Sequence, residues 1–123
     1  MQHAPGFLAI VDDAKSRVRE VTVAETQARC AANPAAVLVD VREDLEWQAG
    51  HAAGALHVGK GVIERDIEGL VPDKGTELIL YCGGGFRSAL SADVLQRMGY
   101  TNVTSMAGGW RAWNDAHAPV AQG

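Results

Sequence analysis

Clusters of basic residues, long apolar runs and closely spaced cysteines are absent from this chain of 123 residues. Its 11 lysine and arginine residues are spread among 15 acidic residues, and the formal net charge is -4. A nucleic-acid partner is therefore not expected, because surfaces that bind nucleic acid need clustered positive charge. No run of about 18 apolar residues occurs, so we also expect no membrane-spanning helix and no membrane partner.

Cysteine and histidine are too sparse to predict a disulfide framework or a metal site. The cysteines are Cys30 and Cys82, and a chain of this length can bury a core without a disulfide. The four histidines are scattered, and neither a Cys-x-x-Cys nor a His-x-x-x-His spacing occurs. We therefore expect no metal and no cofactor.

The N-terminal residues do not predict a targeting signal. They begin MQHAP, without the basic start of a signal peptide, and the apolar stretch at 7–11 is too short for its hydrophobic segment. We therefore expect a cytoplasmic protein. The length and the 47% hydrophobic content suit one compact domain.

Short apolar runs alternate with helical patterns along most of the chain. The runs at 36–39 and 78–80 are apolar on both faces, which is typical of central strands in a parallel sheet. Further strands are expected at 17–21, 55–58 and 102–104. Helices are expected at 5–15, 22–32, 43–48, 62–70, 87–98 and 108–113. This alternation predicts an α/β fold with helices on both faces of the sheet.

The segment that follows the second central strand carries the most chemical information. It reads YCGGGFRS at residues 81–88, so a thiol is followed by three glycines and then by an arginine at a helix start. Glycines let consecutive N–H groups point inward, and a helix N-terminus adds further donors and the positive end of its dipole. Together with Arg87, these groups favour a thiolate at Cys82 with a lowered pKa. A buried structural cysteine is the alternative, but it explains the three glycines poorly.

For three other side chains expected near this loop, the sequence leaves two structural interpretations each. Asp40 ends the first central strand and either accepts hydrogen bonds from the loop or an arginine, or caps the helix at 43–48. Arg42 either steers anions or pairs with a nearby carboxylate such as Glu43 or Glu46. Ser88 either caps its helix or donates a hydrogen bond to the sulfur of Cys82.

Several residues have a simpler expected role. Phe86 is expected to form a pocket wall or a partner contact, and Arg87 to turn toward a carboxylate. His51 and His57 are expected to be hydrogen-bonded structural residues. We expect Cys30 to be a small core residue, and the tryptophans at 110 and 113 to pack in the core.

Taken together, several segments resemble the single-domain rhodaneses, which are thiosulfate sulfurtransferase-like proteins. The likeness covers about residues 18–117 and follows the order of the family's motifs. The segments are LVDVRE at 38–43, the glycines and histidine at 50–55, CGGGFRS at 82–88, MGY at 98–100 and GGW at 108–110. The resemblance implies a rhodanese domain over residues 18–123, preceded by a helical extension over 1–17.

The resemblance also implies a central five-stranded parallel sheet and a persulfide mechanism. Cys82 would take the outer sulfur of a small sulfane-sulfur donor anion such as thiosulfate, and would pass it to cyanide, a thiol or a sulfur-carrier protein. The substrate anion would lie in a loop that also holds the persulfide. That loop consists of Gly83, Gly84, Gly85, Phe86, Arg87 and Ser88, with Asp40 and Arg42 behind it.

Two other functions stay open on the residues alone. Rhodanese-fold phosphatases and related arsenate reductases have five residues between the cysteine and the arginine, whereas this chain has four, at 83–86. The shorter loop suits a sulfur atom better than a phosphoryl group. A non-catalytic sulfide-binding module is the third reading, and it is disfavoured because Cys82 is present. One departure is that Gly83 and Gly84 stand where many thiosulfate-active members carry a basic or hydrogen-bonding side chain.

Overall fold

A parallel sheet organises the protein in the computed structural model, which describes residues 3–122. The five strands of this sheet run in the order β1-β6-β5-β2-β4, and every neighbouring pair is parallel. They are β1 (Arg19–Val21), β2 (Val37–Asp40), β4 (Leu56–His57), β5 (Leu78–Tyr81) and β6 (Val103–Met106). The expected five-stranded parallel sheet is thereby confirmed.

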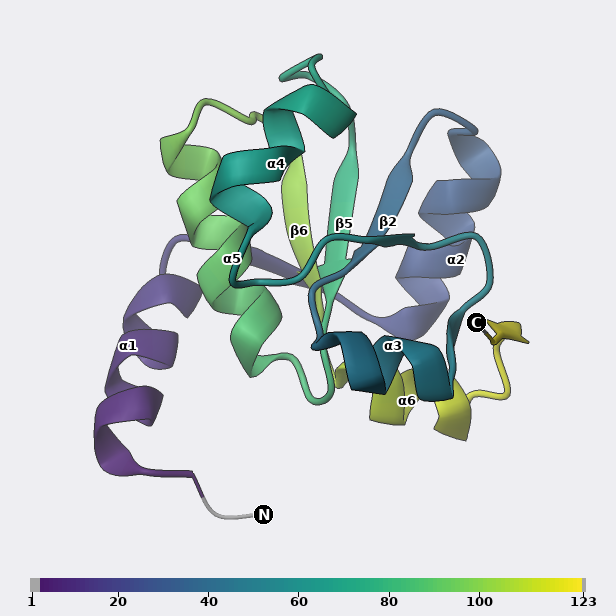
Figure 1. Cartoon of the computed structure of the whole chain (residues 1–123), viewed down its shortest axis with the longest axis horizontal. Helices are drawn as coiled ribbons and strands as arrows, with labels where there is room; N and C mark the ends of the chain where they lie inside the picture. The colour runs from purple at the N-terminus through teal and green to yellow at the C-terminus, as the bar shows by residue number, and fades with distance from the viewer. Residues whose placement is uncertain (1–2, 123) are drawn as a thin grey trace.

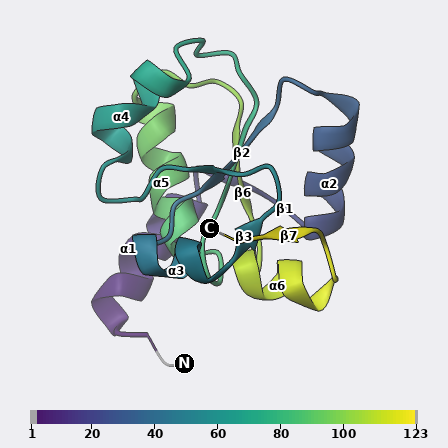
Figure 2. The same ribbon diagram turned by 45° about the vertical axis from the view of Figure 1, so that its right-hand side comes forward.

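Helices cover both faces of this sheet, as the alternating sequence pattern predicts (Figures 1 and 2). The helices are α1 (Pro5–Lys15), α2 (Val23–Ala32), α3 (Asp44–Ala49), α4 (Ile63–Leu70), α5 (Phe86–Arg97) and α6 (Gly109–Asp115). In Figure 1, α4 and α5 lie on one side of the strands and α2 on the other, while α3 and α6 lie together near one end of the sheet. No helix within residues 3–122 is long and apolar enough to cross a membrane.

The burial of β5 explains why the core has two halves. All four residues of β5 are fully buried, and successive side chains of a strand point to opposite faces. Leu78 and Leu80 pack in one apolar cluster with residues of α4 and α5. Ile79 and Tyr81 pack in the other, with residues of α2 and α6. A strand that is buried on both faces needs the continuous apolar run seen in this sequence.

The first helix is fastened to the rest of the domain. Val11 and Ala14 of α1 are buried, with 1% and 2% of their surface exposed. Just beyond the helix, Arg17 donates hydrogen bonds to both carboxylate oxygens of Asp93 on α5, at 3.0 and 2.9 Å. Helix α1 therefore holds a defined position along α5.

A small second sheet was not expected from the sequence. Residues 50–54 were expected to form only a turn, but β3 (His51–Ala52) pairs antiparallel with β7 (Val120–Ala121). Strands of two residues carry too little periodicity to be recognised, and this pairing joins segments far apart in the chain. The remaining differences are shifts of one or two residues at element ends.

Candidate active site

Cys82 lies directly after β5, at the carboxyl end of the sheet, and only 1% of its surface is exposed. The backbone N–H of Gly85 points to its sulfur at 3.2 Å, and the N–H of Ser88 lies at 3.4 Å. Burial by itself would raise the pKa of this thiol. Hydrogen bonds from Ser88, Gly84 and Gly85 outweigh that effect, and they hold the pKa of Cys82 below its ordinary value of 9.0.

The hydroxyl of Ser88 is part of this environment. Its oxygen lies 3.5 Å from the sulfur of Cys82 and 2.8 Å from the hydroxyl oxygen of Ser105 on β6. Capping of α5 by Ser88 is wrong, because the N-cap of that helix is Gly85, which has a φ of 100°. The alternative reading, a contact with the sulfur, is the one the structure shows.

The outer side of the loop is attached to the start of α6. The N–H of Trp110 donates to the carbonyl oxygen of Cys82 at 2.7 Å, and the N–H of Arg111 donates to that of Gly83 at 3.2 Å. Gly109 has a φ of 51°, and a Cβ at this position would overlap the carbonyl oxygen of Cys82. Only glycine allows α6 to approach the loop this closely.

Arg87 is bound to a carboxylate, as expected. Its two terminal nitrogens donate to the two carboxylate oxygens of Glu46 on α3, at 2.8 and 3.0 Å. This hydrogen-bonded pair lowers the pKa of Glu46 below its ordinary value of 4.5. The guanidinium thus connects α3 to the loop, and its positive charge is already partly balanced.

Asp40 and Arg42 form a buried ion pair beneath the site, with 0% and 3% of their surfaces exposed. Arg42 donates to Asp40 at 2.8 Å and to the carbonyl oxygen of Gly50 at 2.7 Å, and the hydroxyl of Tyr81 donates to Asp40 at 2.6 Å. Asp40 does not cap α3, whose N-cap is Glu43. Arg42 pairs with a nearby carboxylate, as one of its two interpretations expected, but the partner is Asp40 and neither Glu43 nor Glu46.

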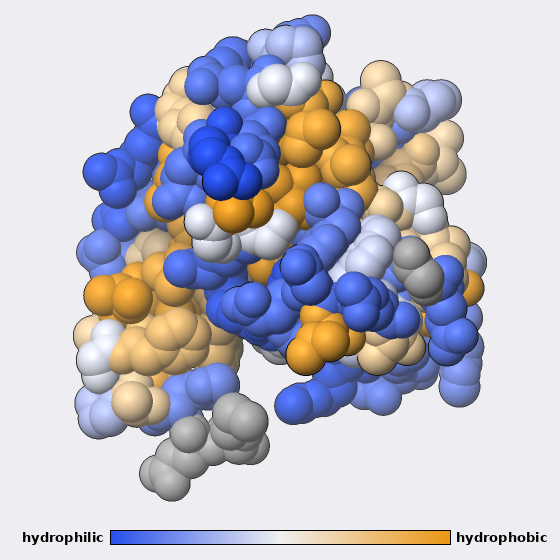
Figure 3. Space-filling view, in the orientation of Figure 1, coloured by the Kyte–Doolittle hydropathy of each residue, from blue (hydrophilic) through white to orange (hydrophobic). Residues whose placement is uncertain are grey.

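The sulfur opens toward a cavity of about 890 Å³. Phe86 forms part of its wall, and the N-terminal segment contributes His3, just before α1, and Phe7 of α1. The ring of Phe86 lies 4.7 Å from that of His3 and 6.2 Å from that of Phe7, measured between ring centroids. The lining residues are His3, Phe7, Glu46, Cys82, Gly83, Gly84, Phe86, Arg87, Trp110, Arg111, Asn114 and Asp115. Figure 3 shows the surface hollowed between the apolar side chains of α1 and the polar surface over α3.

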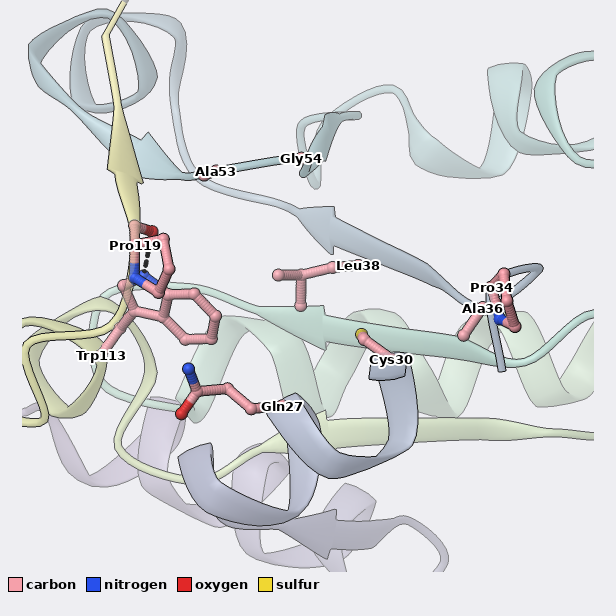
Figure 4. A pocket seen from close by; sticks show the side chains of 9 residues that line it. All are labelled: Gln27, Cys30, Pro34, Ala36, Leu38, Ala53, Gly54, Trp113 and Pro119. Carbon is pink, nitrogen blue, oxygen red and sulfur yellow. Dashed lines mark hydrogen bonds between the residues drawn. The ribbon is translucent and has the colours of Figure 1, made fainter. Parts of the chain in front are cut away.

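A second cavity, of about 370 Å³, lies away from this loop (Figure 4). It is lined by Gln27, Cys30, Pro34, Ala36, Leu38, Ala53, Gly54, Trp113 and Pro119. Cys30 is half-buried rather than fully buried, and burial raises the pKa of its thiol. Figure 4 shows its sulfur beside Leu38, and no loop residue takes part. Among the described residues, no three potential metal ligands gather into a cluster.

Sequence reasoning missed several residues that line or support the site. Glu46 appeared only as a possible partner of Arg42, and Trp110 only as a core residue. Arg111, Ser105 and the side chains of α1 were not considered for the site. The GGW motif that precedes Arg111 was the one available signal: it predicted the start of a helix, but it did not place that helix near the loop.

The fold and the loop define an α/β protein with a buried cysteine facing backbone N–H groups at the carboxyl end of its sheet. The family model for the rhodanese-like domain matches residues 22–116, and the chain belongs to this family. The resemblance drawn from the sequence is thereby confirmed.

The known relatives include sulfurtransferases. Thiosulfate sulfurtransferase GlpE of Haemophilus influenzae is 33% identical over 85 residues, which are 69% of this chain and 79% of that protein. Thiosulfate sulfurtransferase PspE of Escherichia coli is 33% identical over 70 residues, or 57% of this chain and 67% of the relative. Among solved structures, a Rhodopseudomonas palustris protein of unknown function, named a possible tyrosine phosphatase, aligns with a TM-score of 0.86. That match is 29% identical and covers 98% of each chain.

Proposed function

We propose that the protein is a sulfurtransferase that carries sulfane sulfur as a persulfide on Cys82. The observation that supports this most is the pair of N–H donors at 3.2 and 3.4 Å from the sulfur of Cys82, beside the hydroxyl of Ser88 at 3.5 Å, which can donate to the sulfur once the thiol is ionised. These donors stabilise negative charge on sulfur without a general base. The sequence relationship to thiosulfate sulfurtransferases supports the same chemistry.

The proposed reaction has two steps. The thiolate of Cys82 attacks the outer sulfur of a donor such as thiosulfate, a new S–S bond forms, and sulfite leaves with the electron pair of the bond that breaks. A nucleophile such as cyanide, a thiol or a sulfur-carrier protein then attacks the outer sulfur of the persulfide. The S–S bond to Cys82 breaks, and the thiolate is regenerated.

The other site residues have supporting roles in this proposal. The N–H groups of the loop from Gly83 to Ser88 would hold the substrate anion and the persulfide. Arg87 would keep the loop in shape through its pair with Glu46. Asp40 and Arg42 would act further away, by fixing the ends of the strands that carry the loop.

We also propose that residues 1–17 are an extension added to a rhodanese domain over 18–123. The match to the family model begins only at residue 22, after α1 has ended. His3 and Phe7, which line the mouth of the cavity, would then belong to this extension.

Intact-mass spectrometry tests the carrier directly. The protein is mixed with thiosulfate, or with a polysulfide as a second donor, and compared with Cys82→Ser and with Cys30→Ser as a matched control. We expect the mass of one sulfur atom to be gained by the wild type and by Cys30→Ser, and not by Cys82→Ser. If no donor adds sulfur to the wild type, the proposal fails.

Phosphate ester hydrolysis is a second candidate, because the Rhodopseudomonas palustris structure is named a possible tyrosine phosphatase. The four residues between Cys82 and Arg87 speak against it. Hydrolysis of p-nitrophenyl phosphate that is lost in Cys82→Ser would favour this function over sulfur transfer.

A further inference from the structure

Arg111 lies at the mouth of the site, and its positively charged side chain forms no ion pair with another described residue. Its backbone N–H donates a hydrogen bond to the carbonyl oxygen of Gly83, so the backbone of Arg111 lies directly against the loop. Its exposed side chain lines the cavity above Cys82. Among residues 3–122, its guanidinium has neither an ion pair nor a hydrogen bond, whereas the guanidinium of Arg87 is bound to Glu46 through two nitrogens.

The cavity is too large for a small inorganic anion alone. Its volume of about 890 Å³ falls in the range of sites that enclose organic ligands. One wall consists of the rings of Phe7 and Phe86, which offer apolar surface to a carbon chain. The other wall, formed by α6, carries the charge of Arg111. A ligand that fills both parts therefore has an apolar stem and an anionic head.

We propose that the acceptor of the sulfur is a small organic thiol with a carboxylate group, and that Arg111 binds this carboxylate. The proposal rests on the sulfurtransferase function proposed above. The acceptor thiolate attacks the outer sulfur of the Cys82 persulfide. A bond forms between the acceptor sulfur and this outer sulfur, the bond from the outer sulfur to Cys82 breaks, and Cys82 leaves as a thiolate. The product is an organic persulfide, and no oxidant or reductant is consumed.

The position of Asp115 provides a second test of the proposal, with an effect of opposite sign. Asp115 lies one helical turn after Arg111, lines the same cavity, and has no ion pair or hydrogen bond from its side chain within the described part of the chain. A carboxylate bound by Arg111 would be repelled by Asp115. Neutralising Arg111 should therefore weaken the preference for a carboxylate, and neutralising Asp115 should strengthen it.

The test compares acceptors of similar size. The rate of sulfur transfer from the preformed Cys82 persulfide is measured with 3-mercaptopropionate, which carries a carboxylate, and with neutral 2-mercaptoethanol. We expect Arg111→Gln to lower the ratio of the two rates by about threefold to fivefold at low ionic strength. Asp115→Asn should raise the ratio, and added salt should shrink both effects because the groups are exposed. Arg97→Gln is the control, because it removes the same charge at the C-terminal end of α5, the end farther from the Cys82 loop.

Alkylation of Cys82 provides an arm that does not need a persulfide. Iodoacetate and iodoacetamide differ by the same carboxylate, and both form a carbon–sulfur bond with loss of iodide. Arg111→Gln should lower the rate ratio of iodoacetate to iodoacetamide at Cys82 in the Cys30→Ser background. If the persulfide never forms but this ratio falls, the sulfurtransferase function fails and the carboxylate site stands. If the persulfide forms and neither ratio responds to Arg111→Gln, the inference about Arg111 is overturned and the function stands.

Discussion

The N–H of Trp110 donates a hydrogen bond of 2.7 Å to the carbonyl oxygen of Cys82. This bond connects two segments that are far apart in the chain, the loop after β5 and the start of α6. It turns the carbonyl group of the cysteine outward while the N–H groups of the loop point at the sulfur. The direction of the peptide groups around Cys82 thus depends on how closely α6 can approach.

Gly109→Ala tests this close approach. A Cβ at residue 109 would overlap the carbonyl oxygen of Cys82, and the φ of 51° is unfavourable for alanine. We expect a loss of about 2 kcal/mol or more in the free energy of unfolding, measured by urea denaturation. Gly84→Ala is the matched control, because nothing lies within 4 Å of its added Cβ and its φ is not positive. Equal stability of the two variants would contradict the requirement for a glycine where α6 approaches the loop.

The pH dependence of alkylation tests the environment of the Cys82 sulfur. Only the thiolate reacts, so the rate with iodoacetamide should rise with pH through a midpoint below the ordinary cysteine value of 9.0. Ser88→Ala removes a hydroxyl that stabilises the charged form, so the midpoint should move to higher pH. Mass spectrometry of the alkylated peptide gives the rate at Cys82 separately from Cys30.

Ser105→Ala extends this test to β6. When Ser88 donates to the thiolate, the hydroxyl of Ser105 can donate to Ser88 at 2.8 Å and strengthen that bond. We expect an upward shift of the alkylation midpoint, smaller than that of Ser88→Ala. Thr104→Val is the control, since Thr104 is the neighbouring buried residue of β6 and its hydroxyl has no hydrogen-bond partner. An equal shift in Thr104→Val would argue against a chain of hydroxyl groups.

Arg42→Met tests the buried ion pair. The substitution leaves the carboxylate of Asp40 buried with the hydroxyl of Tyr81 as its side-chain donor. We expect a loss of about 3 kcal/mol in the free energy of unfolding. Arg65→Met is the comparison, because Arg65 pairs with Asp66 at the surface with 74% of its side chain exposed, and such pairs contribute about 0–1 kcal/mol. Similar losses in both variants would show that burial does not matter here.

Glu46→Gln tests the link between α3 and the loop. Because the pKa of Glu46 is lowered in the folded state, its pair with Arg87 stabilises the protein above the ordinary value of 4.5 and loses this effect as pH falls through the folded value. The pair is partly exposed, so we expect the glutamine variant to lose less than about 1 kcal/mol at neutral pH. Its stability should also depend less on pH in the acid range. Thermal unfolding between pH 3 and 7 measures both effects, and unchanged pH dependence would count against the pair.

Local patterns in the sequence were sufficient to predict most of the fold. The apolar runs of β2 and β5 predicted central strands because such strands contact protein on both faces. The helix expected at 22–32 matches α2, and its start is fixed by near neighbours, since Thr22 and Glu25 form the two hydrogen bonds of a capping box, at 2.8 and 3.1 Å. The pairing of β3 with β7 was missed, because it depends on contact between distant segments.

In the candidate site, too, local features were predictable from the sequence and contacts between distant segments were not. The order of residues alone placed Cys82, the glycines and the helix start in one loop, since these features follow from neighbouring positions. Two interpretations were open for each of Asp40 and Ser88, and the structure shows the one other than helix capping: Asp40 accepts hydrogen bonds from Arg42, and Ser88 contacts the sulfur of Cys82. Their further contacts with Tyr81 and Ser105 were not predictable, because those residues lie on other strands.

The sequence by itself determined the family, the parallel sheet and the position of a cysteine before a glycine-rich turn. Tertiary structure decided which remote side chains surround that cysteine. Helix α6 brings Arg111 to the cavity, α3 brings Glu46, and α1 brings Phe7. The physical reason is that strand and helix patterns depend on near neighbours, whereas the mouth of the site depends on how separate elements pack at one end of the sheet.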